Sequence, residues 1–190
     1  RMLPLEPDMM AAAVFVVESL NQNGWLDDDV PALAAAFGCP QPVMEQALAA
    51  VQGLEPAGVA ARNLSECLRL QLLRRGGERV SFDPIVAAGA NGSKPHAVPG
   101  DTVIQPGMFV TMDFGCVWRG YCSDMTRTVA VGKPAPEMER VYQVVLEAQQ
   151  AGIAAARAGL AGREIDAAGR TVIQAAGYGE AFSHSFGHSL

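Results

Sequence analysis

The chain has few basic residues and no basic region. Its 190 residues include 14 Lys and Arg against 20 Asp and Glu, a formal net charge of −6. Neither half of the chain carries an excess of Lys and Arg. Because proteins that bind nucleic acid or an anionic membrane through charge need a basic field, we expect no direct contact with nucleic acid and no membrane contact.

Cysteines and long apolar runs are also scarce. Cys39, Cys67, Cys116 and Cys122 show neither a CxxC pair nor zinc-ligand spacing, so we interpret them as reduced thiols. The longest apolar run, residues 9–17, is too short to cross a bilayer, and the beginning of the chain lacks the features of a signal peptide. We therefore expect a soluble, cytoplasmic protein, and both ends of the sequence look cut.

The first part of the chain is expected to be helical throughout. Apolar residues at helical spacing predict a helix over residues 9–20, one that follows Asp29 and ends near Gly38, one after Pro40, and a last one with Asn63 as its N-cap. Residues 1–75 are therefore predicted to form a small all-helical bundle.

The second part, residues 76–190, has a different pattern. "GMFVTMDFG" and "YCSDMTRTVAV" alternate with period 2, as strands do, and helices are expected over residues 134–157 and 164–176. The predicted class is α+β, and the junction with the helical part falls within residues 72–80.

Two carboxylates occur in the two alternating runs. A turn centred between Trp118 and Arg119 would pair Asp113 with Asp124 on one face of a hairpin. Like charges directly opposite one another destabilise a sheet, and a bound cation is the common compensation. The arrangement therefore indicates a metal site.

Three histidines could complete such a site: His96, His184 and His188. Carboxylate and imidazole ligands suit manganese, cobalt or zinc. The segment "HSFGHSL" is expected to be a loop or strand because of Gly187. His184 and His188 are four residues apart, so they share a face in either a helix or an extended segment.

Three segments resemble the successive signatures of the pita-bread metallopeptidases, closest to the Xaa-Pro branch of aminopeptidase P and prolidase. They are "SFDPIVAAGANGSKPHAVPGD", "GMFVTMDFGCVWRGYCSDMTRTVAVG" and "FSHSFGHSL", and the resemblance covers residues 78–190. It implies a hydrolase with two divalent metal ions, Mn²⁺ or Co²⁺ with Zn²⁺ as an alternative, that cleaves Xaa-Pro peptides. By position, the resemblance makes Asp113, Asp124 and His188 metal ligands and gives His96 and His184 a catalytic role beside the substrate.

The chain departs from this family pattern in its ligand set. The resemblance implies two further glutamate ligands on later strands, and Glu147, Glu164 and Glu180 do not stand at matching positions. We expect an incomplete pita-bread half, weak metal binding and little or no peptidase activity from these residues alone, which leaves open whether the chain acts as an enzyme.

Residues 8–73 carry a second resemblance. The stretch "LEPAGVAARNLSECLRLQL" is similar to the core-binding region of the sigma-54 transcription factor. It implies a module that binds core RNA polymerase without touching DNA. A third interpretation is that the chain is an inert chimeric fragment. The sequence leaves open the metal, the choice between aminopeptidase and dipeptidase, and the oligomeric state.

Overall fold

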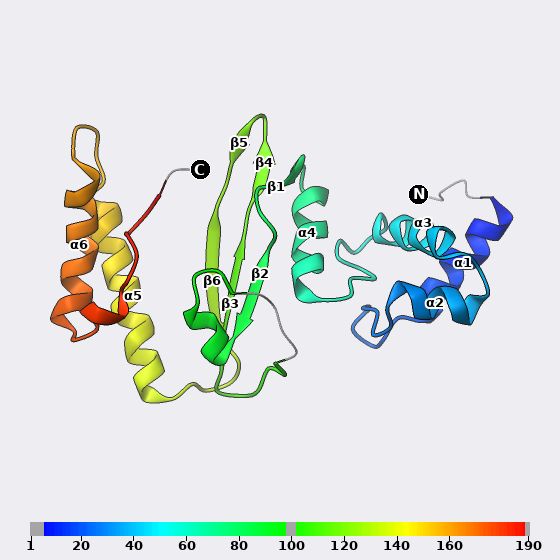
Figure 1. Cartoon of the computed structure of the whole chain (residues 1–190), viewed down its shortest axis with the longest axis horizontal. Coiled ribbons are helices and arrows are strands. Elements are labelled where there is room, and N and C mark those ends of the chain that lie inside the picture. Colours follow the sequence, from blue (N-terminus) through cyan, green and yellow to red (C-terminus); the bar gives the residue numbers. More distant parts are fainter. Residues whose placement is uncertain (1–5, 98–101, 189–190) are drawn as a thin grey trace. The chain divides into compact units, whose positions relative to one another are not determined.

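The protein has the α+β fold class expected from its sequence. The computed structural model describes residues 6–97 and 102–188. These residues form six α-helices, six β-strands and two short 3₁₀-helices (Figure 1). Both expected patterns are thus present, a helical N-terminal part and a later part with strands and helices.

Contacts divide the chain into two compact units. The first comprises Arg1–Ile104 with Phe109–Val129, and the second comprises Gln105–Met108 with Ala130–Leu190. These units are defined by contacts, whereas the predicted parts were defined by sequence pattern and resemblance. The division into parts 1–75 and 76–190 therefore stays a prediction.

Helices α1 (Pro7–Glu18), α2 (Val30–Phe37) and α3 (Gln41–Gln52) pack together within the first unit. Asp29 caps α2 as expected, because its side chain accepts a hydrogen bond from the amide of Ala32 at 2.8 Å. Gly38 ends the same helix with φ of +82°, a left-handed conformation that suits glycine. The apolar faces meet in one core of Ala12, Ala13, Val16, Leu26, Val30, Leu33, Ala34, Met44, Ala47, Leu48, Val51 and Ala60.

Helix α4 (Leu64–Arg74) packs against strands rather than joining this core. Asn63 is its N-cap, as predicted, and accepts a hydrogen bond from the amide of Glu66 at 2.8 Å. The hydroxyl of Ser65 donates to the carbonyl of Pro84 at 2.7 Å, which ties the helix to the segment before the second strand.

The strands form two antiparallel three-stranded sheets. One has the order β1-β4-β5 and the other the order β2-β3-β6. Their bounds are β1 Arg79–Val80, β2 Ile85–Ala88, β3 Phe109–Phe114, β4 Cys116–Trp118, β5 Tyr121–Cys122 and β6 Met125–Ala130.

Gly115 separates the two sheets where the sequence suggested one continuous strand. A Cβ atom at this position would lie 1.9 Å from the carbonyl oxygen of Ser123, so only glycine allows the two backbones to come this close. The Ser123 hydroxyl also accepts a hydrogen bond from the amide of Cys116 at 3.0 Å. The expected hairpin is therefore interrupted on both of its arms.

The predicted pairing of Asp113 with Asp124 is wrong. The turn consists of Arg119 and Gly120, and Val117 pairs with Cys122. Both turn residues have positive φ, +50° and +81°, as a two-residue type I′ turn requires. The turn therefore lies one position later than expected. There the amide of Arg119 also donates to the carboxylate of the distant Glu78 at 3.0 Å.

Two helices form most of the second unit. Helix α5 (Pro136–Ala155) and helix α6 (Gly162–Ala175) pack along one another (Figure 1). The carboxylate of Glu164 accepts a hydrogen bond from the amide of Ala161 at 3.0 Å, so α6 begins two residues before the expected position.

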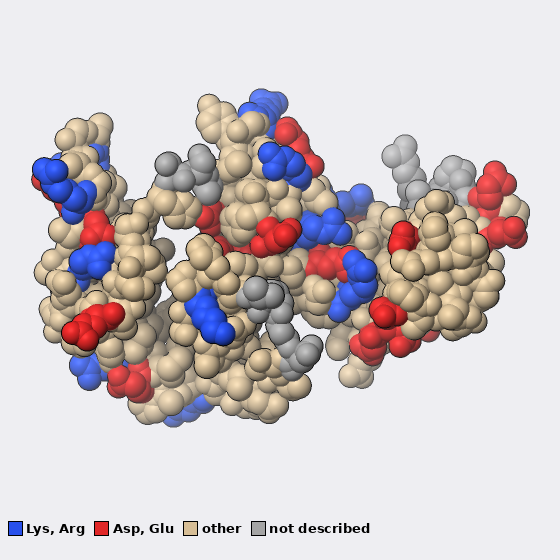
Figure 2. Space-filling view, in the orientation of Figure 1, with Lys and Arg blue, Asp and Glu red and all other residues tan. Residues whose placement is uncertain are grey.

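Surface charge, cysteine pairing and helix composition can be compared with what the sequence predicts. On the face drawn in Figure 2, acidic and basic side chains are interspersed over the later part of the chain, whereas only acidic side chains are seen around α1 to α3, since residues 6–61 contain no Lys or Arg. All four cysteines are unpaired. Within residues 6–97 and 102–188, no helix has both the length and the apolar composition needed to cross a membrane.

Candidate functional site

Asp113 lies in β3, the central strand of its sheet. Its side chain is half-buried, and Oδ1 accepts a hydrogen bond from the hydroxyl of Thr126 at 2.9 Å. Two residues earlier, the hydroxyl of Thr111 lies 3.1 Å from that of Thr128. The carboxylate of Asp113 therefore faces a threonine of β6, where the sequence had predicted Asp124.

Asp124 lies between β5 and β6, outside both strands, and is exposed. The observed pairing differs from the expected pairing by two residues. Because Asp124 lies outside both strands, the alternation of side chains along a strand does not assign its face. The expectation that Asp113 and Asp124 act together therefore stays a prediction.

His96 lies in a turn that follows the 3₁₀-helix Gly89–Ser93, and its side chain is exposed. The next residue, Ala97, is buried, with 4% of its surface exposed. The remainder of the "HAVPGD" motif, residues 98–101, lies outside the described residues. An exposed imidazole in this position is available to a ligand.

His184 and His188 lie in an irregular segment of the second unit, after the 3₁₀-helix Gly179–Ala181. This confirms the expectation that the segment is not helical. Both side chains are exposed, and they line a pocket of about 660 Å³ together with residues of α6. Nδ1 of His184 lies 2.8 Å from the carbonyl oxygen of Ser185. Donation to that oxygen keeps the proton on Nδ1 and leaves Nε2 for other partners.

An ion pair of α6 contacts the backbone of the histidine segment. Arg170 and Asp166 are joined by two hydrogen bonds, Nε to Oδ2 at 2.7 Å and Nη2 to Oδ1 at 3.0 Å. The guanidinium also donates to the carbonyl oxygens of Phe182 at 3.0 Å and His184 at 2.8 Å. The hydrogen bond from Arg170, followed by one from the amide of Phe186, lowers the pKa of Asp166 below its usual range.

The expected metal ligands are distributed over the two compact units. Asp113 and Asp124 belong to the first unit with His96, whereas His184 and His188 belong to the second. Over the described part of the chain, no three side chains of His, Cys, Asp or Glu form a group that could hold a metal ion. The donor chemistry of two carboxylates and an imidazole fits a divalent metal. The assignment of these ligands stays a prediction.

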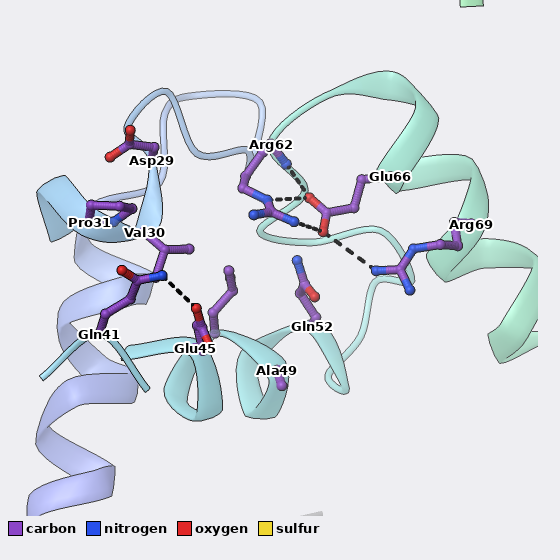
Figure 3. A pocket seen from close by; sticks show the side chains of 11 residues that line it. Asp29, Val30, Pro31, Gln41, Glu45, Ala49, Gln52, Arg62, Glu66 and Arg69 are labelled. Carbon is purple, nitrogen blue, oxygen red and sulfur yellow. Dashed lines mark hydrogen bonds and ion pairs between the residues drawn. The ribbon is translucent and has the colours of Figure 1, made fainter. Parts of the chain in front are cut away.

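A second pocket, of about 360 Å³, lies in the first unit and contains a buried carboxylate (Figure 3). Glu66 is only 7% exposed and is held by Arg62, whose Nη2 lies 2.7 Å from Oε1, and by Arg69 at 3.6 Å. Burial raises the pKa of Glu66, but hydrogen bonds and charge from Arg62 outweigh burial and lower the pKa to about 2. Because the carboxylate is fully paired, this arrangement is typical of a structural ion pair.

Neither the pair of Asp166 and Arg170 nor the pair of Arg62 and Glu66 was predicted from the sequence. Both pairs have a separation of four residues. That spacing supports ion pairs on a helix, as for Asp166 and Arg170, whereas Arg62 lies just before the N-cap of α4. That spacing was a usable signal. It does not reveal that the first pair contacts a distant segment, because those contacts depend on tertiary structure.

Comparison with known proteins identifies the family. The profile of Metallopeptidase family M24 matches residues 40–190, and so begins within the helical part. The uncharacterized peptidase YqhT of Bacillus subtilis is 45% identical over 133 residues, which are 70% of this chain and 38% of that protein. The Xaa-Pro dipeptidase of Lactobacillus delbrueckii subsp. lactis is 42% identical over 134 residues, 70% of this chain and 36% of that protein.

A solved structure agrees with these relatives. The Xaa-Pro dipeptidase from Bacillus anthracis superposes with a TM-score of 0.63 and 48% identity over 65% of this chain and 35% of that protein. The chain thus spans little more than a third of the length of these relatives. Since the family profile covers well over half of the residues, the chain belongs to Metallopeptidase family M24.

Proposed function

We propose that this chain supplies part of the active site of a metal-dependent peptidase that acts on Xaa-Pro peptides. The observation that carries the proposal is the match of residues 40–190 to family M24, together with relatives whose names specify Xaa-Pro dipeptidases. Because the chain spans 38% of its relative from Bacillus subtilis, the activity of the whole protein is part of the proposal. We also propose that the protein is cytoplasmic, because four unpaired thiols suit a reducing compartment.

The proposed ligands are Asp113, Asp124 and His188, and the metal is Mn²⁺, Co²⁺ or Zn²⁺. When bound, two such ions supply Lewis acidity and a water of lowered pKa. Asp113 is supported for this role by its half-buried position in a central strand, where the bond from Thr126 orients the carboxylate.

The proposed substrate contacts are His96 and His184. Both imidazoles are exposed in irregular segments, where a peptide can reach them. With its Nδ1 proton directed to the Ser185 carbonyl, His184 offers Nε2, which donates a hydrogen bond when the ring is charged and accepts one when it is neutral. Either histidine could in this way bind the peptide carbonyl or stabilise charge that develops on it.

Thermal unfolding in the presence of Mn²⁺, Co²⁺ or Zn²⁺ tests this proposal. A ligand present at 100 times its Kd stabilises the folded state by about 2.7 kcal/mol, which raises Tm by several degrees. We expect such a shift for the unvaried chain and its loss in Asp124→Ala. Asp83→Ala removes another exposed carboxylate and should retain the shift. If none of the three metals raises Tm, the proposed metal site is wrong.

A second candidate function is binding to core RNA polymerase through residues 8–73. Besides the sequence resemblance, helix α1 exposes an apolar stripe of Met10, Val14 and Val17, with exposed fractions of 37%, 46% and 47%. Residues at this spacing share one helix face and suit a groove on a partner protein.

A pull-down with purified core polymerase, without DNA, tests the second candidate. We expect polymerase subunits to be recovered with the unvaried chain and lost with Val14→Lys. Ala11→Lys places the same charge at an exposed position of α1 off the stripe and should retain binding. Failure to recover polymerase with the unvaried chain excludes this function.

A further inference from the structure

The segment that carries His184 and His188 is attached to helices α5 and α6 at alternate residues. Arg170 donates to the carbonyl oxygens of Phe182 and His184, and Asp166 accepts from the amide of Phe186 at 2.8 Å. The three anchored positions are thus 182, 184 and 186. The backbone of the motif is held while the two imidazole side chains remain exposed.

These hydrogen bonds to the segment require both Arg170 and Asp166. Two donors of the guanidinium bind Asp166 and two more bind backbone carbonyls, which uses four of its five N–H groups. An ammonium group has three donors and no planar fork, so lysine cannot make the same set of bonds. The carboxylate in turn binds both the guanidinium and the amide of Phe186.

Aromatic contacts reinforce the same attachment. The guanidinium of Arg170 stacks over the ring of Phe182, 4.6 Å from its centroid, and the ring of His184 packs edge-on to Phe182 at 4.9 Å. The ring of Phe186 lies against Gly152 of α5 and Gly169 of α6, where an added Cβ would come within 2.1 Å and 2.6 Å of ring atoms. The rings of Phe182 and Phe186 therefore add packing contacts to the hydrogen bonds of the backbone.

We propose that Asp166 and Arg170 are positioning residues that hold the segment 182–188 so that His184 and His188 are presented at fixed places on the second unit. This inference rests on the proposed roles of the two histidines. The pair acts through the backbone of the segment, because its hydrogen bonds to the segment are made to carbonyl and amide groups, and the ring that Arg170 stacks on is that of Phe182 and not an imidazole. It would set the geometry of one metal ligand and one substrate contact without itself touching metal or substrate.

Amide hydrogen exchange and NMR of the metal-free chain test the attachment directly. The amide of Phe186 should exchange slowly in the unvaried chain. In Arg170→Lys and Asp166→Asn it should exchange about tenfold faster or more, while amides within α5 keep their protection. The imidazole Cε1–H resonances of His184 and His188 should shift in both variants. Thr171→Ala alters an exposed residue of α6 whose hydroxyl donates to the carbonyl oxygen of Ala167 in the same helix. It should change neither the exchange of the Phe186 amide nor the imidazole resonances.

Two results would overturn the proposal. One is an amide of Phe186 that stays protected, with unchanged histidine resonances, in both variants. The other is loss of protection throughout α5 and α6, because the pair would then support the helices rather than position the segment.

A metal titration then separates this inference from the proposed function. If the chain binds Mn²⁺, we expect both variants to bind it about tenfold more weakly and Thr171→Ala to bind it normally. A chain that binds no metal counts against the proposed function and not against the positioning pair, because the exchange and imidazole signals are read without metal. Unchanged affinity in both variants contradicts a role of the pair in placing His188.

Discussion

At the scale of single residues, the chain places its charges in two different ways. Glu66 is buried and paired, with a pKa lowered to about 2 mainly because the bonds from Arg62 outweigh the effect of burial. Asp113, in contrast, is half-buried and receives its bond from a neutral hydroxyl, that of Thr126. The first arrangement stabilises a fold, whereas the second leaves a carboxylate able to bind a cation.

Replacing Glu66 should change how stability depends on pH. The folded-state pKa of about 2 lies below the ordinary value of 4.5, so the ionised carboxylate stabilises the fold fully above pH 4.5. That contribution, about 3 kcal/mol at most, is lost as pH falls from 4.5 towards 2. We expect Glu66→Gln to lower the free energy of unfolding at pH 7 by about 1–3 kcal/mol and to remove this part of the pH dependence.

Urea unfolding of the chain over a series of pH values measures both effects. Glu45→Gln is the matched control, because Glu45 lines the same pocket but is exposed, bonds to Gln41, and acts on Arg62 only through a charge interaction that is weaker than that of Glu66. The control should keep the pH dependence of the unvaried chain. An unchanged pH dependence in Glu66→Gln would show that the pair with Arg62 does not form.

At the scale of elements, glycines determine where segments approach one another. Gly115 allows two strands to come together at the break between the sheets, and Gly152 and Gly169 make room for the ring of Phe186 on α5 and α6. In each case the reason is close approach, since the added Cβ would overlap a neighbouring atom. Such positions join secondary-structure elements that the sequence presents separately.

Gly152→Ala should destabilise the second unit although alanine favours helices. The added Cβ would lie 2.1 Å from the Phe186 ring, and overpacking of this kind costs about 1–3 kcal/mol. Gly162→Ala, at the beginning of α6, meets no atom within 4 Å and should be neutral or slightly stabilising. Thermal unfolding followed by circular dichroism compares the two variants. Equal Tm values would mean that the ring does not occupy this place.

At the scale of the whole molecule, two compact units share one chain. Glu66 and its partners lie in the first unit, and Gly152 with Phe186 lies in the second. Substitutions at these places therefore probe the units separately. Stability that is distributed over several cooperative units is a common property of proteins of this size.

We expect hydrogen exchange to show this separation. Glu66→Gln should raise amide exchange in α3 and α4 and leave exchange in α5 and α6 unchanged. Gly152→Ala should raise exchange in α5 and α6 and leave α3 and α4 unchanged. The measurement is exchange followed by mass spectrometry of peptides from the whole chain. If both variants raise exchange everywhere, the units unfold together. If the unvaried chain shows no protection at all, the interpretation as an inert fragment is supported instead.

The sequence by itself determined the α+β class, the order of the helices and the family resemblance. These rest on local signals, since Asp29, Gly38 and Asn63 act within one turn of the helices that they begin or end. The motifs that resemble Xaa-Pro peptidases are likewise read along the chain, and the match to family M24 agrees with them.

The tertiary structure alone decided the register of the hairpin and the attachment of the histidine segment. The turn is joined to Glu78 by a bond from Arg119, 41 residues away, and at the break Ser123 approaches Gly115 closely. The amide of Phe186 reaches Asp166 across 20 residues. Such contacts form only when distant parts of the chain meet, so no local pattern could have specified them.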